Sequence, residues 1–204
     1  MKVLIACEFS GIVRDAFLEK GHDAMSCDLL PTEKPGPHYQ GDVFDIINDG
    51  WDMMIGHPPC TYISYAGTRH WNKPGRVFDR LEALTFFARL WEAPIDRICL
   101  ENPKSCASPV IAKYSQEIQP YYFGDSDRKT TWLWLKNLPP LVHIRSDGLF
   151  DDCTHVPPPE PSGISKSGKK LYRTEYMGGP SSDRAKNRAR TFPGIARAMA
   201  DQWG

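Results

Sequence analysis

The sequence "IGHPPCTYIS" (residues 55–64) places one cysteine at a rigid corner of the chain. Pro58 and Pro59 directly precede Cys60, and proline fixes φ and lacks the N–H that would continue a strand. A cysteine that merely fills a core needs no such corner, so we interpret Cys60 as an accessible nucleophile; a buried core thiol is the alternative. A thiol reacts as its thiolate, which requires positive charge nearby, and the sequence offers three candidates for that charge: His57, Arg69 and Arg128.

Polar residues also follow two other apolar runs that we expect to form strands. Glu101 and Asn102 follow "ICL", and Asp28 follows "HDAMSC". Because the carboxyl ends of parallel strands meet at one edge of a sheet, we expect these residues to lie near Cys60. The alternative for Glu101 is an ordinary helix-capping or loop acid. Asp28 is placed to accept hydrogen bonds from both hydroxyls of a ribose.

The segment "EFSG" (residues 8–11) follows the first apolar run and precedes an amphipathic stretch. Gly11 would let a ligand approach the backbone and the amino end of the helix. The stretch "FSGIVRDAF" lacks the GxGxxG spacing of a dinucleotide site, and Arg14 stands where such a site requires a small residue. The pattern therefore disfavours a hydride-transfer cofactor and favours an adenosine-bearing cofactor with a short tail.

Apolar runs and amphipathic segments alternate along the chain, which predicts an α/β fold with a doubly wound, mostly parallel, Rossmann-like sheet. Strands are expected at residues 2–7, 22–28, 51–56, 96–103 and 130–135, and helices at 12–20, 77–93, 108–115 and from 193 onward. Residues 30–42 are expected to form turns only. The helix at 77–93 is expected to face the core with Phe78, Leu81, Leu84, Thr85, Ala88 and Leu90.

The composition is that of a soluble globular protein, with 204 residues, 41% hydrophobic and 25% charged. No apolar run approaches the length of a bilayer span and no signal-peptide pattern is present, so a cytoplasmic location is expected. The six cysteines lack zinc-ligand spacing, and no structural metal is expected.

The segment from 141 to 184 is rich in Pro, Gly, Ser and Lys. We predict a short, flexible, basic insertion there, and a main domain at 1–140 plus 185–204. The formal net charge is zero, but basic residues cluster between Lys166 and Arg190. Such a cluster suits contacts with phosphates, and a solvated surface is the alternative.

Together, and in this order, the segments resemble the motifs of the cytosine carbon-5 DNA methyltransferases. "PPCTYISYAG" is similar to the Pro-Cys motif of that family, "EFSG" to its Phe-x-Gly cofactor loop, and "LENP" to its Glu-Asn-Val motif. "DRKTTWLWL" resembles its arginine-bearing strand and "RTFPGIARAMA" its closing motif. The resemblance covers residues 1–140 and the terminal helix, as in a compact, phage-encoded member with a reduced target-recognition region.

The resemblance implies that S-adenosyl-L-methionine donates a methyl group to carbon 5 of a cytosine flipped out of duplex DNA. It implies three catalytic residues: Cys60 as the nucleophile, Glu101 as the acid at ring nitrogen 3, and Arg128 as the arginine that favours the thiolate of Cys60. Cofactor contacts are implied at Phe9, Ser10, Gly11, Asp28, Asp42 and Pro58. Substrate contacts are implied at Asn102, Ser64, Arg69, Lys129 and Arg173.

The sequence departs from the family pattern at several positions. Thr61 replaces a glutamine, Pro103 replaces a valine, and residues 12–13 replace glycines. Lys129 fits the arginine position nearly as well as Arg128, and Asp42 after a glycine also has the pattern of a turn. The small recognition region leaves two alternatives open: the same chemistry on a free cytosine nucleotide, and a non-catalytic DNA-binding module with this fold.

Overall fold

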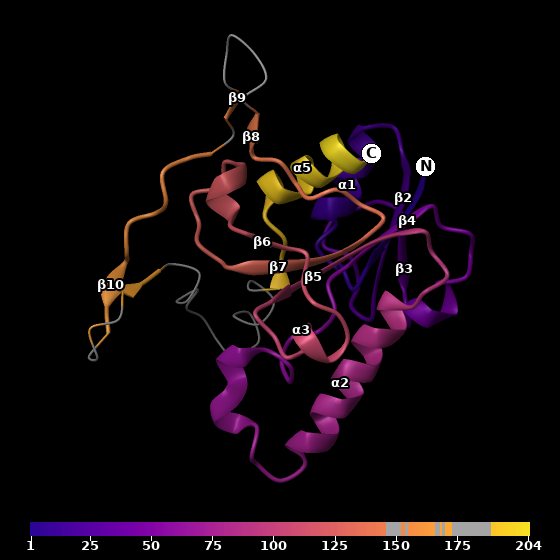
Figure 1. Ribbon diagram of the computed structural model, residues 1–204. Coiled ribbons are helices and arrows are strands. Elements are labelled where there is room, and N and C mark those ends of the chain that lie inside the picture. Colours follow the sequence, from indigo (N-terminus) through magenta and orange to yellow (C-terminus); the bar gives the residue numbers. More distant parts are fainter. Residues whose placement is uncertain (146–151, 154, 166–167, 169, 173–188) are drawn as a thin grey trace.

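The computed structural model describes residues 1–145, 152–153, 155–165, 168, 170–172 and 189–204 (Figure 1). The strands of the main sheet are β1 (Lys2–Ala6), β2 (Asp23–Asp28), β3 (His38–Gln40), β4 (Met53–Gly56), β5 (Arg97–Pro103), β6 (Gln116–Ile118) and β7 (Thr131–Lys136). The α-helices are α1 (Ile12–Glu19), α2 (Arg76–Trp91), α3 (Ala107–Val110) and α5 (Pro193–Trp203). Three 3-10 helices are η1 (Val43–Asp45), η2 (Tyr65–His70) and η3 (Pro120–Phe123).

The main sheet has seven strands in the order β3-β2-β1-β4-β5-β7-β6. Strands β3, β2, β1, β4 and β5 run parallel, whereas β7 is antiparallel to both of its neighbours, β5 and β6. This order is the Rossmann-like arrangement of the S-adenosylmethionine-dependent methyltransferases. The predicted doubly wound, mostly parallel sheet is therefore confirmed.

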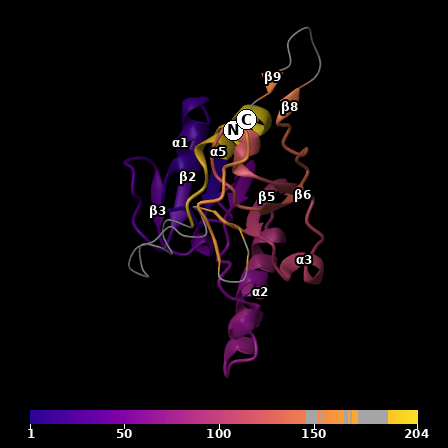
Figure 2. The ribbon, with the colours of Figure 1, turned by 90° about the vertical axis from the view of Figure 1, so that its left-hand side faces the viewer.

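Helices cover both faces of the sheet (Figures 1 and 2). On one face α1 and α5 pack around Val3 and Ile5 of β1. On the other face α2 packs against a core that contains Leu4 and Ala6 of the same strand. Because both faces are buried, the central strands have almost continuous apolar sequences instead of alternating ones.

Helix α5 begins in close contact with η3. The N–H of Gly194 donates to Asp125 Oδ2 at 2.8 Å, and a Cβ at Gly194 would overlap the carbonyl oxygen of Phe123. Only glycine allows this approach. The docking brings Thr191, just before α5, to the carboxyl edge of the sheet, where its Oγ1 lies 3.4 Å from Nδ1 of His57.

Two expectations about local structure were wrong. Strand β3 forms an edge of the sheet inside residues 30–42, where only turns were expected. Helix α3 spans four residues instead of the expected 108–115, and Ser108 within it has extended angles (φ −103°, ψ 121°). The cause is Pro109, since a proline disfavours the helical conformation of the residue before it.

The expected inner face of α2 was wrong mainly in the first half of the helix. Phe78 and Leu81 are 72% and 55% exposed, whereas Phe87, which was not expected to face the core, is fully buried. Leu90 is buried as expected. The first half of α2 extends away from the sheet, so only its second half has a core to pack against (Figures 1 and 2).

The described parts of residues 141–184 include two short hairpins. Strand β8 (Ile144–Arg145) pairs with β9 (Asp152–Cys153), and β10 (Gly163–Ile164) pairs with β11 (Lys170–Leu171). Leu141, expected to lie outside the core, is 2% exposed and packs within it. Among the described residues, no helix combines the length and the apolar character needed to cross a bilayer.

Candidate active site

The corner that carries Cys60 lies directly beyond the carboxyl end of β4. Asn102 Nδ2, on the neighbouring strand β5, donates to the carbonyl oxygen of Pro58 at 2.8 Å. The carbonyl oxygen of Cys60 accepts the N–H of Ser64 at 2.9 Å, which closes the turn behind the thiol. Cys60 is partly exposed. The two prolines and the bond from Asn102 thus hold an accessible thiol at the edge of the sheet.

Glu101 lies on β5 in a pair with His57. Its Oε2 is 2.9 Å from Nδ1 of His57, and its Oε1 is 3.9 Å from Nζ of Lys129. The side chains of His57 and Glu101 are 7% and 9% exposed. Burial raises the pKa of Glu101, but Lys129, His57 and a hydrogen bond from Thr131 outweigh it and lower that pKa to about 2. Glu101 is therefore a buried carboxylate at neutral pH.

The loop after Cys60 is attached to the segment after β5. Ser64 forms an antiparallel bridge with Ser105, and the N–H of Tyr65 donates to the carbonyl oxygen of Lys104 at 3.0 Å. Ser64 is 8% exposed, and its hydroxyl accepts the N–H of Ala66 at 3.2 Å, which caps η2. The predicted substrate residue Ser64 therefore has a structural contact at the start of η2.

Several buried polar atoms around this corner have no hydrogen-bond partner among the described residues. They are Nε2 of His57, Oδ1 of Asn102 and Oγ of Ser105. Buried polar atoms in native proteins are usually paired, because an unpaired one costs about 1–3 kcal/mol. These atoms therefore indicate a place where a bound molecule or water supplies the missing partners.

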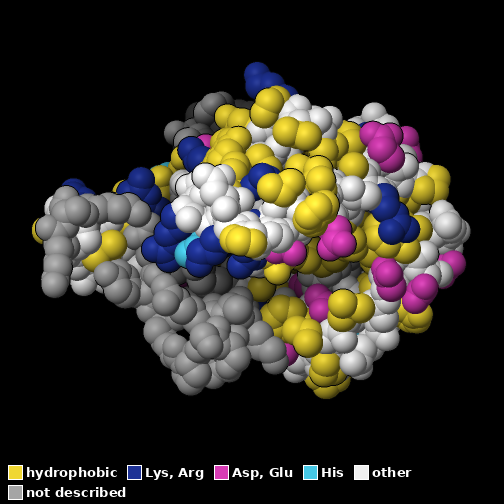
Figure 3. Space-filling model, turned by 90° about the horizontal axis from the view of Figure 1, so that it is seen from below, with side chains coloured by type: hydrophobic (Ala, Val, Ile, Leu, Met, Phe, Trp, Pro, Cys, Tyr) yellow, Lys and Arg dark blue, Asp and Glu magenta, His cyan; other side chains and the backbone are white. Residues whose placement is uncertain are grey.

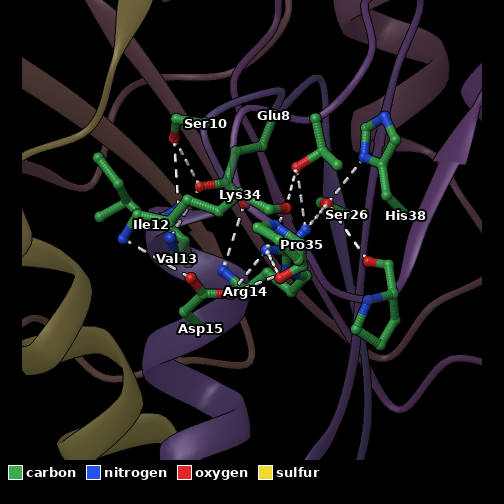
Figure 4. Close-up of polar contacts among 12 residues, drawn as sticks. Glu8, Ser10, Ile12, Val13, Arg14, Asp15, Ser26, Lys34, Pro35 and His38 are labelled. Carbon is green, nitrogen blue, oxygen red and sulfur yellow. Dashed lines mark hydrogen bonds and ion pairs between the residues drawn. The ribbon is translucent and has the colours of Figure 1, made fainter.

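Glu8 occupies the amino end of α1. Its carboxylate accepts the N–H groups of Val13 at 2.7 Å and Arg14 at 3.2 Å, and Ser10 Oγ donates to it at 3.1 Å (Figure 4). Phe9 and Ser10 are 7% and 3% exposed. A carboxylate already at the helix terminus leaves no room for the phosphate that a dinucleotide would place there, in agreement with the missing GxGxxG pattern.

Arg14 fills the space that the absent side chain of Gly11 leaves. A Cβ at Gly11, whose φ is +71°, would lie 2.5 Å from Nη2 of Arg14. The guanidinium group is fully buried and donates to Ser26 Oγ, Thr32 Oγ1 and the carbonyl oxygens of Lys34 and Pro35 (Figure 4). Arg14 thus occupies the side of Gly11 on which a side chain would stand, and the expected approach of a ligand to the Gly11 backbone stays a prediction.

Asp28 ends β2 at the same edge. Its Oδ1 accepts the N–H of Leu30 at 2.9 Å, and burial raises its pKa. Leu29 and Leu30, which follow it, are 73% and 40% exposed.

Cys7, at the end of β1, adopts a left-handed φ of 58°, and burial together with Asp28 raises the pKa of its thiol. Strained backbone of this kind is concentrated at functional sites.

Asp42 caps η1 by accepting the N–H of Phe44 at 3.0 Å. This contact matches the alternative in which Asp42 forms a turn. Arg128 and Lys129 lie just before β7 and have different partners. Lys129 lies near Glu101, whereas Nη1 of Arg128 donates to the hydroxyl of Tyr172 at 2.6 Å. Lys129 is thus the basic residue that the structure brings to Glu101.

A basic face follows the Cys60 corner, and we define it by Arg69, His70, Lys73 and Arg76. Partial desolvation and the charges of Lys73, Arg69 and Arg76 lower the pKa of His70. Figure 3, seen from the side of η2 and the start of α2, shows Lys and Arg side chains gathered there. A small hollow of about 90 Å³ joins this face to the residues after Cys60; its lining comprises Thr61, Tyr62, Gly67, His70, Trp71 and Arg76.

The sequence did not single out every residue that the structure brings to this edge. Glu8 was given no role by the sequence, and Arg14 only argued against a dinucleotide site, but both are buried at the amino end of α1. His57 was expected only as a source of positive charge for Cys60, whereas its Nδ1 lies 2.9 Å from Oε2 of Glu101. The signal for His57 is its position directly before the proline corner at a strand end. The predicted Arg173 lies outside the described residues.

No family model matches the sequence, and no curated protein matches it. A similar solved structure is that of an Escherichia coli protein provisionally described as a DNA modification methyltransferase encoded within a prophage. It is 15% identical, with a TM-score of 0.42, and the match covers 65% of this chain but only 45% of that one. The chain thus has a methyltransferase-like fold, which follows from the strand order of its own sheet.

Proposed function

We propose that the protein transfers a methyl group from S-adenosyl-L-methionine to carbon 5 of cytosine in DNA, with Cys60 as the nucleophile. One observation carries the proposal. The partly exposed Cys60 corner is bonded through Asn102 to the strand whose buried Glu101 lies at the same edge of a methyltransferase-type sheet. A nucleophile and an acid–base group on adjacent strand ends are what addition to an unsaturated ring requires.

The chemistry starts at carbon 6 of the ring. The Cys60 thiolate forms a bond to carbon 6, and the electron pair of the 5,6 double bond moves toward the ring nitrogens. Carbon 5 becomes nucleophilic, receives the methyl group and then loses its proton to water. The bond between sulfur and carbon 6 breaks, the double bond re-forms, and Cys60 leaves as thiolate.

The residues around Asp28 fit an adenosine-bearing donor. The carboxylate of Asp28 stands at the end of β2, where it can accept hydrogen bonds from ribose hydroxyls, and the exposed Leu29 and Leu30 offer apolar cover for an adenine ring. Phe9, Ser10 and Gly11 would shape the wall of this site from the β1–α1 turn. When bound, S-adenosyl-L-methionine supplies an electrophilic methyl group on its sulfonium.

The basic face supports DNA as the substrate. Arg69 and Lys73 lie in the loop with η2 that follows the nucleophile, and Arg76 begins α2 at the end of this loop, so phosphate contacts there would keep DNA next to Cys60. A cytosine in duplex DNA must rotate out of the stack before the thiol reaches carbon 6. Trp71 and Tyr65, with ring centroids 5.9 Å apart, stand in the same loop and can stack on bases.

The proposal is tested by trapping the covalent intermediate. DNA containing 5-fluorocytosine lacks the proton that must leave carbon 5, so the adduct accumulates. With S-adenosyl-L-methionine present, wild-type protein is expected to form a protein–DNA adduct that withstands denaturation, and Cys60→Ser none. Cys106→Ser, which changes another partly exposed thiol, is the matched control and is expected to form the adduct. Cofactor binding without any adduct would contradict the proposal.

A transfer assay separates the alternatives left open by the sequence. Label from methyl-labelled cofactor is expected in duplex DNA and is expected to disappear with Cys60→Ser. Label in free dCMP but in no DNA would favour the nucleotide as substrate. Retention of DNA without any transfer of label would favour a binding module.

A further inference from the structure

The proposed function gives the acid–base role to Glu101 and leaves its buried partner His57 without one. His57 follows β4 directly and lies opposite Glu101 in the register of β4 with β5, one residue beyond the pair of Gly56 with Leu100. Nδ1 of His57 lies 2.9 Å from Oε2 of Glu101, and both side chains are more than nine-tenths buried. The imidazole is therefore fixed by a carboxylate, in a segment that continues to the Cys60 corner.

The hydrogen bond fixes what each ring nitrogen does. A carboxylate only accepts hydrogen bonds, so Nδ1 of His57 carries a hydrogen and donates it to Glu101. Nε2 is then left to interact elsewhere, as an acceptor in the neutral ring or a donor in the imidazolium. It is buried and has no partner among the described residues. A hydrogen bond from Nε2 to a bound molecule would remove the free-energy cost of leaving this buried nitrogen unpaired.

Glu101 is poorly suited to carry the transferred proton itself. Lys129 lies 3.9 Å from its Oε1, and its Oε2 is occupied by His57. Although burial raises the pKa of Glu101, Lys129, His57 and Thr131 together hold it at about 2. At neutral pH the carboxylate stabilises a positive charge next to it, and His57 is the adjacent group that can take up and release a proton.

We propose that His57 is the catalytic acid of the reaction, with Nε2–H donating to ring nitrogen 3 of cytosine and Glu101 acting as the positioning residue that orients the imidazolium. The inference rests on the proposed function and changes its acid from Glu101 to His57. As sulfur bonds to carbon 6, the electron pair released from the 5,6 double bond is accommodated by protonation of nitrogen 3, and the imidazole is left neutral. When sulfur leaves, nitrogen 3 returns that proton to Nε2.

The charged and polar groups around His57 come from several elements. Glu101 on β5 lies 2.9 Å away, Asp28 on β2 interacts with it electrostatically, and Thr191 Oγ1 lies 3.4 Å from Nδ1. Lys129 acts on the pair through Glu101. The ring thus has a fixed carboxylate partner at Nδ1, and Nε2 remains for the substrate.

The test is the pH dependence of adduct formation on 5-fluorocytosine DNA at saturating DNA and S-adenosyl-L-methionine. An active protein needs a Cys60 thiolate and a protonated His57, so the wild-type rate is expected to rise and then fall with pH. His57→Gln is expected to lower the rate about 100-fold or more and to remove the fall at high pH. Glu101→Gln is expected to keep that fall but to lower the maximal rate, because the imidazole loses the carboxylate that orients it.

The variants His57→Gln and Glu101→Gln together show which of the two residues is the catalytic acid. If Glu101 were the acid, Glu101→Gln would remove the high-pH fall and His57→Gln would keep it, and the inference would be overturned. An unchanged profile in His57→Gln would also overturn it while leaving the proposed function intact. Absence of adduct in the wild-type protein would instead contradict the proposed function. His22→Gln, before the amino end of β2 and thus at the opposite edge, is the matched control and is expected to keep the wild-type profile.

Discussion

At the scale of single residues, the β1–α1 turn shows how the protein replaces a glycine-rich loop. The guanidinium group of Arg14 fills the space that a glycine-rich loop would leave open. It also joins α1 to residues 32–35 through hydrogen bonds. Glu33 in the same segment forms a two-pronged ion pair with Arg190, with atoms 2.9 and 2.6 Å apart. The turn is thus stabilised by buried side-chain bonds and by the C-terminal segment.

This packing predicts that Gly11→Ala destabilises the protein more than Gly21→Ala. Both glycines have positive φ, +71° and +80°, so both substitutions carry the strain of a left-handed alanine. Only Gly11 faces an obstacle, Nη2 of Arg14 at 2.5 Å from the new Cβ. We expect overpacking to add about 1–3 kcal/mol at Gly11, measured as the difference in free energy of unfolding by urea. Equal losses for the two variants would contradict this role of Arg14.

At the scale of elements, α2 has a buried half and an exposed half. Its second half covers the sheet, with Phe87 in edge contact with Trp134 of β7 (ring centroids 5.0 Å apart). Its first half extends away from the sheet and exposes Val77, Phe78 and Leu81. The same helix therefore contains apolar side chains with very different contributions to stability.

Two matched substitutions in α2 test this division. Phe87→Ala removes a fully buried ring and is expected to lower the free energy of unfolding by about 3–5 kcal/mol. Phe78→Ala removes a ring that is 72% exposed and is expected to change it by less than about 0.5 kcal/mol. Thermal or urea unfolding monitored by circular dichroism measures both. A large loss from Phe78→Ala would mean that the first half of α2 is packed in solution.

At the scale of the whole molecule, a net charge of zero coexists with a local concentration of positive charge. The basic face of Arg69, His70, Lys73 and Arg76 lies next to the Cys60 corner, and acidic groups are gathered elsewhere on the surface seen in Figure 3. Electrostatic attraction of a polyanion depends on such local distribution more than on the net charge.

The DNA affinity of the whole protein is therefore expected to depend on salt through this face. The double variant Arg69→Ala/Lys73→Ala is expected to bind duplex DNA more weakly at low salt. The slope of log K against log salt concentration should become shallower by about 0.9 for each phosphate that the variant no longer neutralises. Fluorescence anisotropy over a range of salt concentrations measures both. Lys20→Ala, where Lys20 is paired with Asp201 of α5, is the matched control and should leave the slope unchanged.

The sequence by itself determined the strand and helix alternation, the parallel core, and the positions of Cys60, Asp28 and Glu101 at strand ends. These features depend on local periodicity and on prolines and glycines, which act within a few residues. The short edge strands and the truncated α3 were missed, because pairing with a neighbouring strand and the effect of Pro109 outweighed local propensity.

Only the tertiary structure decided which side chains meet. His57 reaches Glu101 across 44 residues, and Lys129 approaches the same carboxylate from the turn before β7. Arg14 enters the space beside Gly11, and Thr191 arrives through the docking of α5. Distant segments are brought together by burial of a common core and by pairing of buried charges, and neither leaves a periodic signal in the sequence. The pairing of His57 with Glu101 was therefore not predictable from the sequence alone.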